Sequence, residues 1–315
     1  MRAIAFQPQA AGTGAARSFP VTEAAEPVPG PGQLLVRAEA AGVGVGLVRM
    51  LRSGLLPAAG PGGEFVGRVT SVGPDVTGYQ AGDRVGGVVF EGLYAGSVLA
   101  VPQLVSPVPA GAGAAEALAL VRGGLVASCI LRAGQLAAGE SVLVTAAASG
   151  TGHLAVQLAR ALGARRVTAA VSSADKAGFL RDCGADEVVT YAQDSWGEPA
   201  DLVLDGVGGD LVQRGVDALA PRGRLVAFSA GGGSVDAGSL LAGLKSVTGF
   251  SMGLISRQQP ELIGERRAEL WRLLAAGQLR PACTTLPFGQ LGAAIELIES
   301  RRNLGRVVLT PGLIR

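Results

Sequence analysis

The segment from Glu140 to Ala164, ESVLVTAAASGTGHLAVQLARALGA, constrains the fold of this chain more than any other stretch. Val142–Val144 is typical of a buried strand, and the apolar residues that follow the turn recur at helical spacing. The turn between them is built from small residues, among them Ser149, Gly150, Thr151 and Gly152. Small residues let a backbone approach a pyrophosphate, and a helix N-terminus offers N–H groups to an anion. The pattern predicts a dinucleotide site, as a variant of the GxGxxG fingerprint; the alternative is an ordinary, tightly packed βα turn.

The next expected strand, Arg166–Val171, indicates which dinucleotide is bound. An NAD site usually places an acidic residue at the end of this strand, where it holds the ribose hydroxyls. This chain has Ser172 and Ser173 there, and Lys176 shortly after. Hydroxyl groups and an ammonium group suit a 2′-phosphate, so the sequence favours NADP(H) over NAD(H).

Three further residues bear on the choice between NADP(H) and NAD(H). Asp175 is acidic, but at the start of an expected helix it serves equally well as an N-terminal residue. Lys176 has the alternative of a solvated surface lysine. Tyr191, at the end of a short strand expected over 187–191, would add a phenol group as a donor to the phosphate.

The segments VTAAASGTGHLAVQLARALGA and VSSADKAGFLRDCGADEVVTY resemble the cofactor domain of the medium-chain dehydrogenase/reductase superfamily. Within it, they are most similar to the zinc-independent quinone oxidoreductase and enoyl reductase branch. PGPGQLLVRAEAAGVG and GGEFVGRVTSVGPDVTGYQAGDRV resemble the N-terminal catalytic domain of this branch, and NLGRVVL resembles its final strand. The resemblance implies an α/β fold: a Rossmann-type doubly wound parallel sheet plus a GroES-like, β-rich, partly open barrel.

The resemblance also implies two domains. Residues 1–120 would form the GroES-like catalytic domain, completed by 266–315, and residues 121–265 the Rossmann dinucleotide-binding domain. A chain of 315 residues is long enough for two such cores. We expect helices over 265–276 and 291–301 and a closing strand over 306–310.

Composition excludes several other classes of protein. With 48% hydrophobic and 17% charged residues, the chain is not generally disordered. A net charge of +2 without a basic block argues against a nucleic-acid partner. Arg122 and other charges interrupt the best apolar runs, so we expect no membrane span, and MRAIAFQ lacks the features of a signal peptide. Cysteines 129, 183 and 283 form no CxxC pair, which favours a reducing cytoplasm.

The sequence argues against a zinc site. Zinc relatives use a histidine from a GHE motif, and the equivalent here is Gly62, Gly63 and Glu64. His153 is the one histidine of the chain, and it falls in the expected cofactor helix. Because zinc sites are built mainly from imidazole and thiolate, we predict no bound metal, and we read His153 as a first-turn helix residue.

Further cofactor contacts follow from the resemblance. In relatives, the loops after the later strands pass the adenosine, the nicotinamide ribose and the nicotinamide, and the C-terminal segment reaches the cofactor. The matching positions in this chain are Gly206, Val207, Phe228, Ser229, Ala230, Phe250, Met252, Asn303 and Arg306. For the apolar members, packing against the sheet is an equally good interpretation.

The chemistry implied by the resemblance is hydride transfer from NADPH to a quinone or an α,β-unsaturated carbonyl, either an enone or an enoyl thioester. The chain departs from the family at the usual polar positions of the active site. Glycine or apolar residues stand there instead, namely Gly44, Val45, Met50, Leu56 and Val126. No catalytic residue is therefore assigned. Other polar candidates, each with a structural alternative, are Arg49, Arg52, Tyr94, Arg122 and Ser128.

These departures leave three hypotheses open: a reductase, an NADP-binding enzyme repurposed for a non-reducing step such as a cyclisation, and a non-enzymatic cofactor-binding protein. The expected partners are a small-molecule substrate and, by resemblance, a second copy of the chain. Residues 246–250, SVTGF, would pair across a two-fold axis as the edge strand of the nucleotide sheet.

Overall fold

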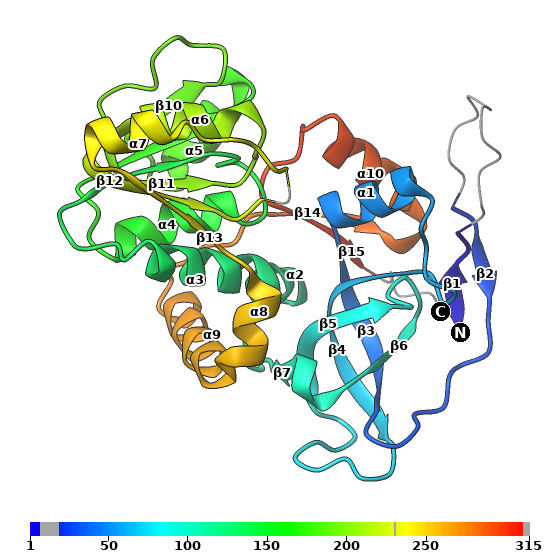
Figure 1. Ribbon diagram of the computed structural model, residues 1–315. Helices are drawn as coiled ribbons and strands as arrows, with labels where there is room; N and C mark the ends of the chain where they lie inside the picture. The colour runs from blue at the N-terminus through cyan, green and yellow to red at the C-terminus, as the bar shows by residue number, and fades with distance from the viewer. Residues whose placement is uncertain (7–18, 230, 311–315) are drawn as a thin grey trace. The chain divides into compact units, whose positions relative to one another are not determined.

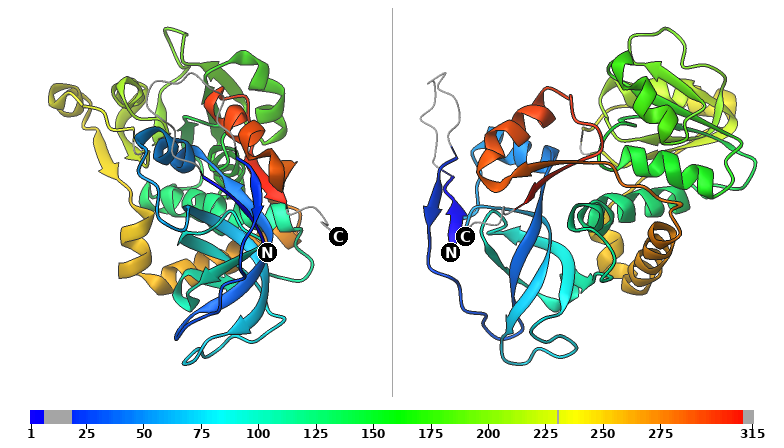
Figure 2. Two further views of the ribbon diagram at one scale, coloured as in Figure 1. Left: turned by 90° about the vertical axis from the view of Figure 1, so that its right-hand side faces the viewer. Right: turned by 180° about the vertical axis from the view of Figure 1, so that it is seen from behind.

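The computed structural model describes residues 1–6, 19–229 and 231–310, and the chain divides into two compact units. The first unit consists of Met1–Arg122 and Cys283–Arg315, and the second of Gly123–Ala282. This division differs from the return to the first domain expected at residue 266. Helix α9 (Pro260–Ala275) packs on α3 (Leu125–Ala133) of the second unit and buries its apolar face there (Figure 2).

The second unit is built on a six-stranded parallel sheet among the described residues. The strands, in chain order, are β8 (Ser141–Val144), β9 (Arg166–Val171), β10 (Glu187–Thr190), β11 (Ala200–Asp205), β12 (Leu219–Ala227) and β13 (Ser246–Gly249). In space the order is β10-β9-β8-β11-β12-β13. This is the doubly wound order of dinucleotide-binding sheets. From the central pair of β8 and β11, successive strands are added toward one edge of the sheet and then toward the other.

Helices cover both faces of this sheet. Besides α3 and α9, the second unit contains the helices α4 (Gly152–Ala161), α5 (Ala177–Asp182), α6 (Asp210–Asp217), α7 (Ala237–Gly243) and α8 (Met252–Gln258). Helices α3 and α4 lie on one side of the strands and α6 and α7 on the other (Figure 1). Because both faces are covered, the central strands are apolar throughout: Val142, Leu143 and Val144 are each at most 1% exposed.

The first unit is dominated by a mostly antiparallel sheet of order β14-β15-β3-β4-β5-β7, with β6 also paired to β3. Its elements are β1 (Arg2–Ile4), β2 (Val21–Glu23), β3 (Leu34–Val43), α1 (Val45–Ser53), β4 (Pro61–Val72), β5 (Arg84–Glu91), β6 (Ser97–Ala100), β7 (Val105–Pro107), α2 (Ala114–Ala119), β14 (Cys283–Pro287), α10 (Leu291–Glu299) and β15 (Arg306–Thr310). Strand β15, red in Figure 2, lies beside the blue strand β3, so residues from the two ends of the chain share one core.

One helical stretch runs against our expectation about membrane spans. Within the described residues, Ala114–Ala133 is long and apolar enough to cross a bilayer by length and composition alone, despite Arg122. Within its most apolar 18-residue window, 72% is buried. A mostly buried core helix passes the same test of length and composition.

Candidate nucleotide-binding site

The turn between β8 and α4 can be formed only with glycine at its last position. A Cβ atom added to Gly152 would lie 2.2 Å from the carbonyl oxygen of Ala146 and 2.7 Å from the Cα of Ala147. The Gly152 N–H donates to Ser149 Oγ at 3.0 Å, which closes the turn. The sequence-predicted residues 149–152 are thus brought together at the N-terminus of α4, at the carboxyl edge of the sheet.

Free backbone donors remain in this turn. Among the hydrogen bonds of the described residues, none uses the N–H groups of Gly150 or Thr151. Helix α4 adds the partial positive charge of its N-terminus to the same place. Two unused donors beside a helix N-terminus, in a turn too tight for a side chain, fit a pyrophosphate.

A buried carboxylate holds the loop after β11, at the point where the strand order reverses between β8 and β11. Asp205, fully buried at the end of β11, accepts from Thr145 Oγ1 at 2.9 Å and from the Gly208 N–H at 2.9 Å. Thr145 Oγ1 in turn accepts from the Gly206 N–H at 2.9 Å. The loops after β8 and β11 are therefore held together. Asp205 and Thr145 were not among the predicted cofactor residues, although the segment DGVGG at the end of an expected strand is a signal for them.

The loops after β11 and β12 are also in contact. Ser229 Oγ donates to the Val207 carbonyl at 2.9 Å. A Cβ on Gly206 would lie 2.7 Å from the ring of Phe228, so that ring rests against the glycine backbone. Four of the predicted cofactor residues thus come together here. Ala230 lies outside the described residues.

The predicted phosphate-binding residues after β9 differ in exposure. Ser172 and Ser173 are exposed, whereas Lys176 is 8% exposed and is not a solvated surface lysine. The hydroxyl of Tyr191 donates to the Ala170 carbonyl at 3.2 Å and accepts from the Ala146 N–H at 2.8 Å. The proton of this hydroxyl is therefore already donated within the fold. Through its two hydrogen bonds the hydroxyl links the turn after β8 to the end of β9.

The remaining predicted cofactor residues lie further along the chain. Phe250 and Met252 are half-buried after β13, where the Phe250 N–H donates to the Ala227 carbonyl at 2.9 Å. Asn303 and Arg306 belong to the first unit. Asn303 Nδ2 donates to the Gly305 carbonyl at 3.2 Å, and Arg306 Nη2 lies 2.8 Å from Glu64 Oε2.

His153 has a structural role. It is fully buried, its Nδ1 lies 2.8 Å from the Ser149 carbonyl, and its Nε2 accepts from the Ala282 N–H at 3.0 Å. Since Nε2 is an acceptor, the ring is neutral and carries its proton on Nδ1. Burial lowers the pKa of His153 from 6.5 to about 4, opposed only in part by the bond to Ser149. The imidazole thus links the start of α4 to the end of the second unit.

This depressed pKa predicts a loss of stability in mild acid. Between pH 6.5 and pH 4 the unfolded chain binds a proton that the folded chain excludes, so stability falls as the pH is lowered. The His153 contribution to that loss is about 3 kcal/mol. Denaturant unfolding of the wild type and of His153→Asn at several pH values measures it: the wild type should lose about 3 kcal/mol more than the variant. Parallel pH profiles would contradict this assignment.

The first unit contains a separate buried charge cluster. Glu64, 7% exposed, pairs with Arg306 and lies 3.9 Å from Arg122 Nη1. Burial works to raise its pKa, but the two guanidinium groups outweigh it and hold the pKa of Glu64 below the usual value. Tyr94 donates to the Gly42 carbonyl at 2.9 Å, and burial, aided by Glu64, raises its pKa.

The Arg306 guanidinium lies against the backbone of Gly42 and Gly44. A Cβ on Gly44 would lie 2.8 Å from Arg306 Nη1, and one on Gly42 would lie 2.3 Å from Arg306 Nη2. A side chain at position 44 would therefore require the Arg306 guanidinium to move. Sequence reasoning did not predict this pair of Glu64 and Arg306.

Metal ligands do not gather in the part of the chain that the structure describes. No three His, Cys, Asp or Glu side chains there form a group that could hold an ion. The absence of zinc stays a prediction, which rests on Gly62–Glu64 in place of a GHE motif.

Comparison with known proteins identifies the family. Residues 30–128 match the model of the alcohol dehydrogenase GroES-like domain, and residues 150–266 match that of the zinc-binding dehydrogenases. A quinone oxidoreductase of Pseudomonas aeruginosa is 33% identical, over 90% of this chain and 92% of that protein. The chain belongs to the medium-chain dehydrogenase/reductase superfamily, in its quinone oxidoreductase branch. The predicted family and the predicted fold class are confirmed.

One solved structure and one much larger protein also resemble this chain. The structure of Escherichia coli quinone oxidoreductase complexed with NADPH superposes with a TM-score of 0.87, at 28% identity, over 99% of this chain and all of that one. A mycocerosic acid synthase-like polyketide synthase of Mycolicibacterium smegmatis is 30% identical over 89% of this chain. The chain spans only 14% of that synthase's length, so it resembles one segment of a much larger protein.

Proposed function

We propose that this medium-chain dehydrogenase/reductase is an NADPH-dependent, zinc-independent reductase of a quinone or an α,β-unsaturated carbonyl compound. The observation that carries the proposal is the turn after β8, where Gly152 admits no side chain and two N–H groups remain unused. The E. coli relative solved with NADPH and the P. aeruginosa quinone oxidoreductase support it. When bound, the nicotinamide supplies the hydride.

The residues of the chain supply position and binding. The turn over residues 149–152 would hold the pyrophosphate, and Ser172, Ser173 and Lys176 the 2′-phosphate. The loops fixed by Asp205 and by the bond from Ser229 to Val207 would hold the adenosine and ribose. With glycine at position 44, we propose that solvent delivers the proton that an enolate or quinol oxygen requires.

Two classes of acceptor follow from the relatives. The P. aeruginosa protein supports a quinone. The likeness to a segment of a polyketide synthase supports an enoyl thioester. NADPH oxidation with quinones, enones and enoyl thioesters, followed by absorbance, tests the reductase directly. Turnover would support it, whereas product formation without cofactor consumption would favour the repurposed enzyme. Tight NADPH binding with no turnover would favour the non-enzymatic protein.

Cofactor preference can be tested separately from the reaction. The variant Lys176→Ala is expected to weaken NADPH binding by about ten- to a hundredfold, since it removes a charge-assisted bond to the 2′-phosphate, and to leave NADH binding unchanged. Arg181→Ala, which removes an exposed cation at the end of α5, is the matched control. Titration of the intrinsic fluorescence with both cofactors measures the change. Equal losses for NADPH and NADH would show that Lys176 does not contact the phosphate.

We further propose a homodimer through β13. This strand lies at the end of the described sheet, so one row of its backbone groups has no partner strand. Leu241 and Leu244, in and after the neighbouring α7, are 78% and 66% exposed. Light scattering that gives the mass of one chain would refute the dimer.

The three free cysteines, Cys129, Cys183 and Cys283, support a reducing cytoplasmic location.

A further inference from the structure

The two unused N–H groups of the turn over residues 149–152 belong to consecutive peptide groups. The Gly150 N–H shares a peptide plane with the Ser149 carbonyl, and the Thr151 N–H shares one with the Gly150 carbonyl. In a trans peptide the N–H and the C=O point in opposite directions, and the described residues contain no cis peptide bond. A group that holds either carbonyl on one side of the turn therefore sets the direction of the partner N–H on the other side.

The Ser149 carbonyl is held by His153. It accepts from His153 Nδ1 at 2.8 Å and from the His153 backbone N–H at 3.2 Å. The Ala282 N–H donates to His153 Nε2 at 3.0 Å, which keeps the ring proton on Nδ1. The buried imidazole thus presents a donor to this carbonyl. Because the carbonyl faces the His153 ring, the Gly150 N–H faces away from it.

The Gly150 carbonyl packs against Gly123. This glycine lies in the π-helical turn Leu120–Gly124, which leads into α3. A Cβ atom on Gly123 would lie 2.8 Å from the Gly150 oxygen and 3.4 Å from its carbonyl carbon, so any larger residue would displace this carbonyl. The Thr151 N–H, on the opposite side of the same peptide plane, points away from Gly123.

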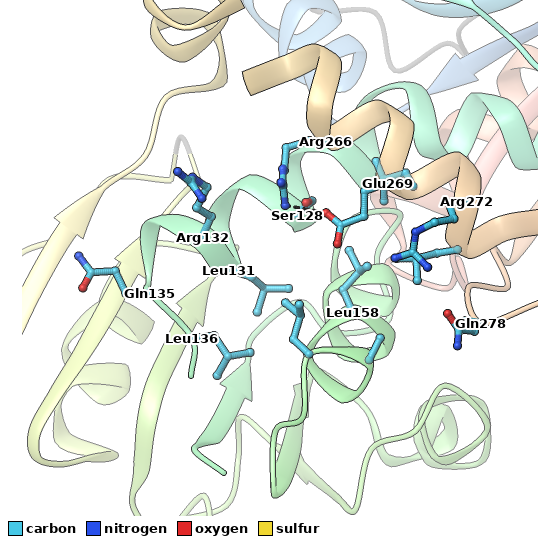
Figure 3. Close-up of a pocket in the computed structure, with 14 residues that line it drawn as sticks. Ser128, Leu131, Arg132, Gln135, Leu136, Leu158, Arg266, Glu269, Arg272 and Gln278 are labelled. Atoms are coloured by element: carbon cyan, nitrogen blue, oxygen red, sulfur yellow. Dashed lines mark hydrogen bonds and ion pairs between the residues drawn. The ribbon is translucent and has the colours of Figure 1, made fainter. Parts of the chain in front are cut away.

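The packing of α3 along α4 keeps Gly123 in place beside the turn. Leu131 of α3 and Leu158 of α4 line the same groove and are each at most 4% exposed (Figure 3). Close-packed interiors transmit a displacement rather than absorb it. A side chain added at Gly123 would therefore move the Gly150 carbonyl rather than the helix.

We infer that His153 and Gly123 are positioning residues for the cofactor: by holding the carbonyls of Ser149 and Gly150, they orient the N–H groups of Gly150 and Thr151 toward the pyrophosphate. Neither residue needs to touch the cofactor. The inference rests on the proposed function, since it takes this turn as the pyrophosphate site. Donors that are oriented before binding lose little freedom when the anion arrives.

Two variants of His153 separate the roles of its ring nitrogens. In His153→Gln the amide oxygen reaches the place of Nε2 and can accept from Ala282, but the donor to Ser149 is lost. In His153→Asn the amide nitrogen lies at the place of Nδ1 and can donate to Ser149, but the acceptor for Ala282 is lost. We expect the dissociation constant of NADPH to rise about tenfold in His153→Gln and to change by less than about threefold in His153→Asn.

Isothermal titration calorimetry on the full chain measures these constants. Equal losses of affinity in the two variants would show that His153 supports only the fold. NADPH binding by His153→Gln that matches the wild type would overturn the role of His153.

Gly123→Ala tests the second peptide plane without touching the first. The added Cβ displaces the Gly150 carbonyl, so the dissociation constant of NADPH is expected to rise about tenfold or more. Gly264→Ala is the matched control, because Gly264 lies inside α9 and a Cβ there would meet no atom within 4 Å. Wild-type affinity in Gly123→Ala would overturn the role of Gly123.

Two further readouts distinguish this inference from the proposed function. The losses should be equal for NADPH and NADH, which share the pyrophosphate, whereas Lys176→Ala should affect NADPH alone. In NMR spectra the amide resonances of Gly150 and Thr151 should shift when NADPH is added to the wild type or to His153→Asn, and should shift less in His153→Gln. If the wild type does not bind NADPH, the proposed function is wrong. If it binds and shifts these amides, yet His153→Gln and Gly123→Ala behave in the same way, only the positioning role is wrong.

Discussion

Gly152→Ala is expected to abolish measurable NADPH binding and to lower the free energy of unfolding by about 3 kcal/mol. The added Cβ would lie 2.2 Å from the Ala146 carbonyl oxygen, well inside van der Waals contact. Both atoms nearest to it are backbone atoms of the same turn, so neither can rotate away. The turn would have to open, and its N–H groups would no longer point to one place. Thermal unfolding and a fluorescence titration with NADPH measure the two effects.

Gly178→Ala is the matched control for this substitution. Gly178 lies inside α5, and a Cβ there would meet no atom within 4 Å. Alanine is the better helix former, so the control is expected to gain up to about 1 kcal/mol. If Gly152→Ala binds NADPH like the wild type, the turn after β8 is not the pyrophosphate site.

Glu64→Gln is expected to destabilise the first unit by about 3–5 kcal/mol, because it leaves Arg306 as an uncompensated buried cation. The Arg306 side chain is only 13% exposed, and the backbones of Gly42 and Gly44 lie against it. Denaturant unfolding measures the loss. Adding Arg306→Met to the variant should recover much of it, since the double variant buries no charge.

An exposed ion pair of the same unit provides the comparison. Arg2 and Glu23 lie 3.5 Å apart with side chains 49% and 78% exposed, so Glu23→Gln should change stability by less than about 1 kcal/mol. The Glu64 contribution should also depend on pH. Because its pKa is lowered in the folded state, the contribution is present above the unfolded pKa and is lost as the pH falls below it. Equal effects of the two substitutions would show that Glu64 does not stabilise Arg306.

The local parts of this fold could be predicted from the sequence because their signals are contiguous. The strand Arg166–Val171 and the closing strand Arg306–Thr310 have the predicted bounds, and the β8–α4 turn is marked by its small residues. The expected helix over 265–276 instead begins at Pro260, since proline is favoured in the first turn.

Contacts between distant residues could not be predicted. Glu64 and Arg306 come from strands β4 and β15, which become neighbours of β3 only through the topology of the sheet. The link from His153 to Ala282 likewise depends on where the chain passes after α9. Helical periodicity shows that α9 buries one face, but it does not show that α3 is the element that covers this face.

The place of β15 in the first sheet has a consequence during synthesis. Strand β3 is made well before its partner β15, which is complete only when residues 306–310 appear. At about 5–20 residues per second, Ala41–Val43 of β3 stay without this partner strand for roughly 15–50 seconds, while Leu34–Arg37 can already pair with β6. The second unit, one continuous stretch of chain, can fold completely within that interval. The nascent first unit therefore keeps part of a strand edge open until the chain is nearly complete, and slower translation would prolong that exposure.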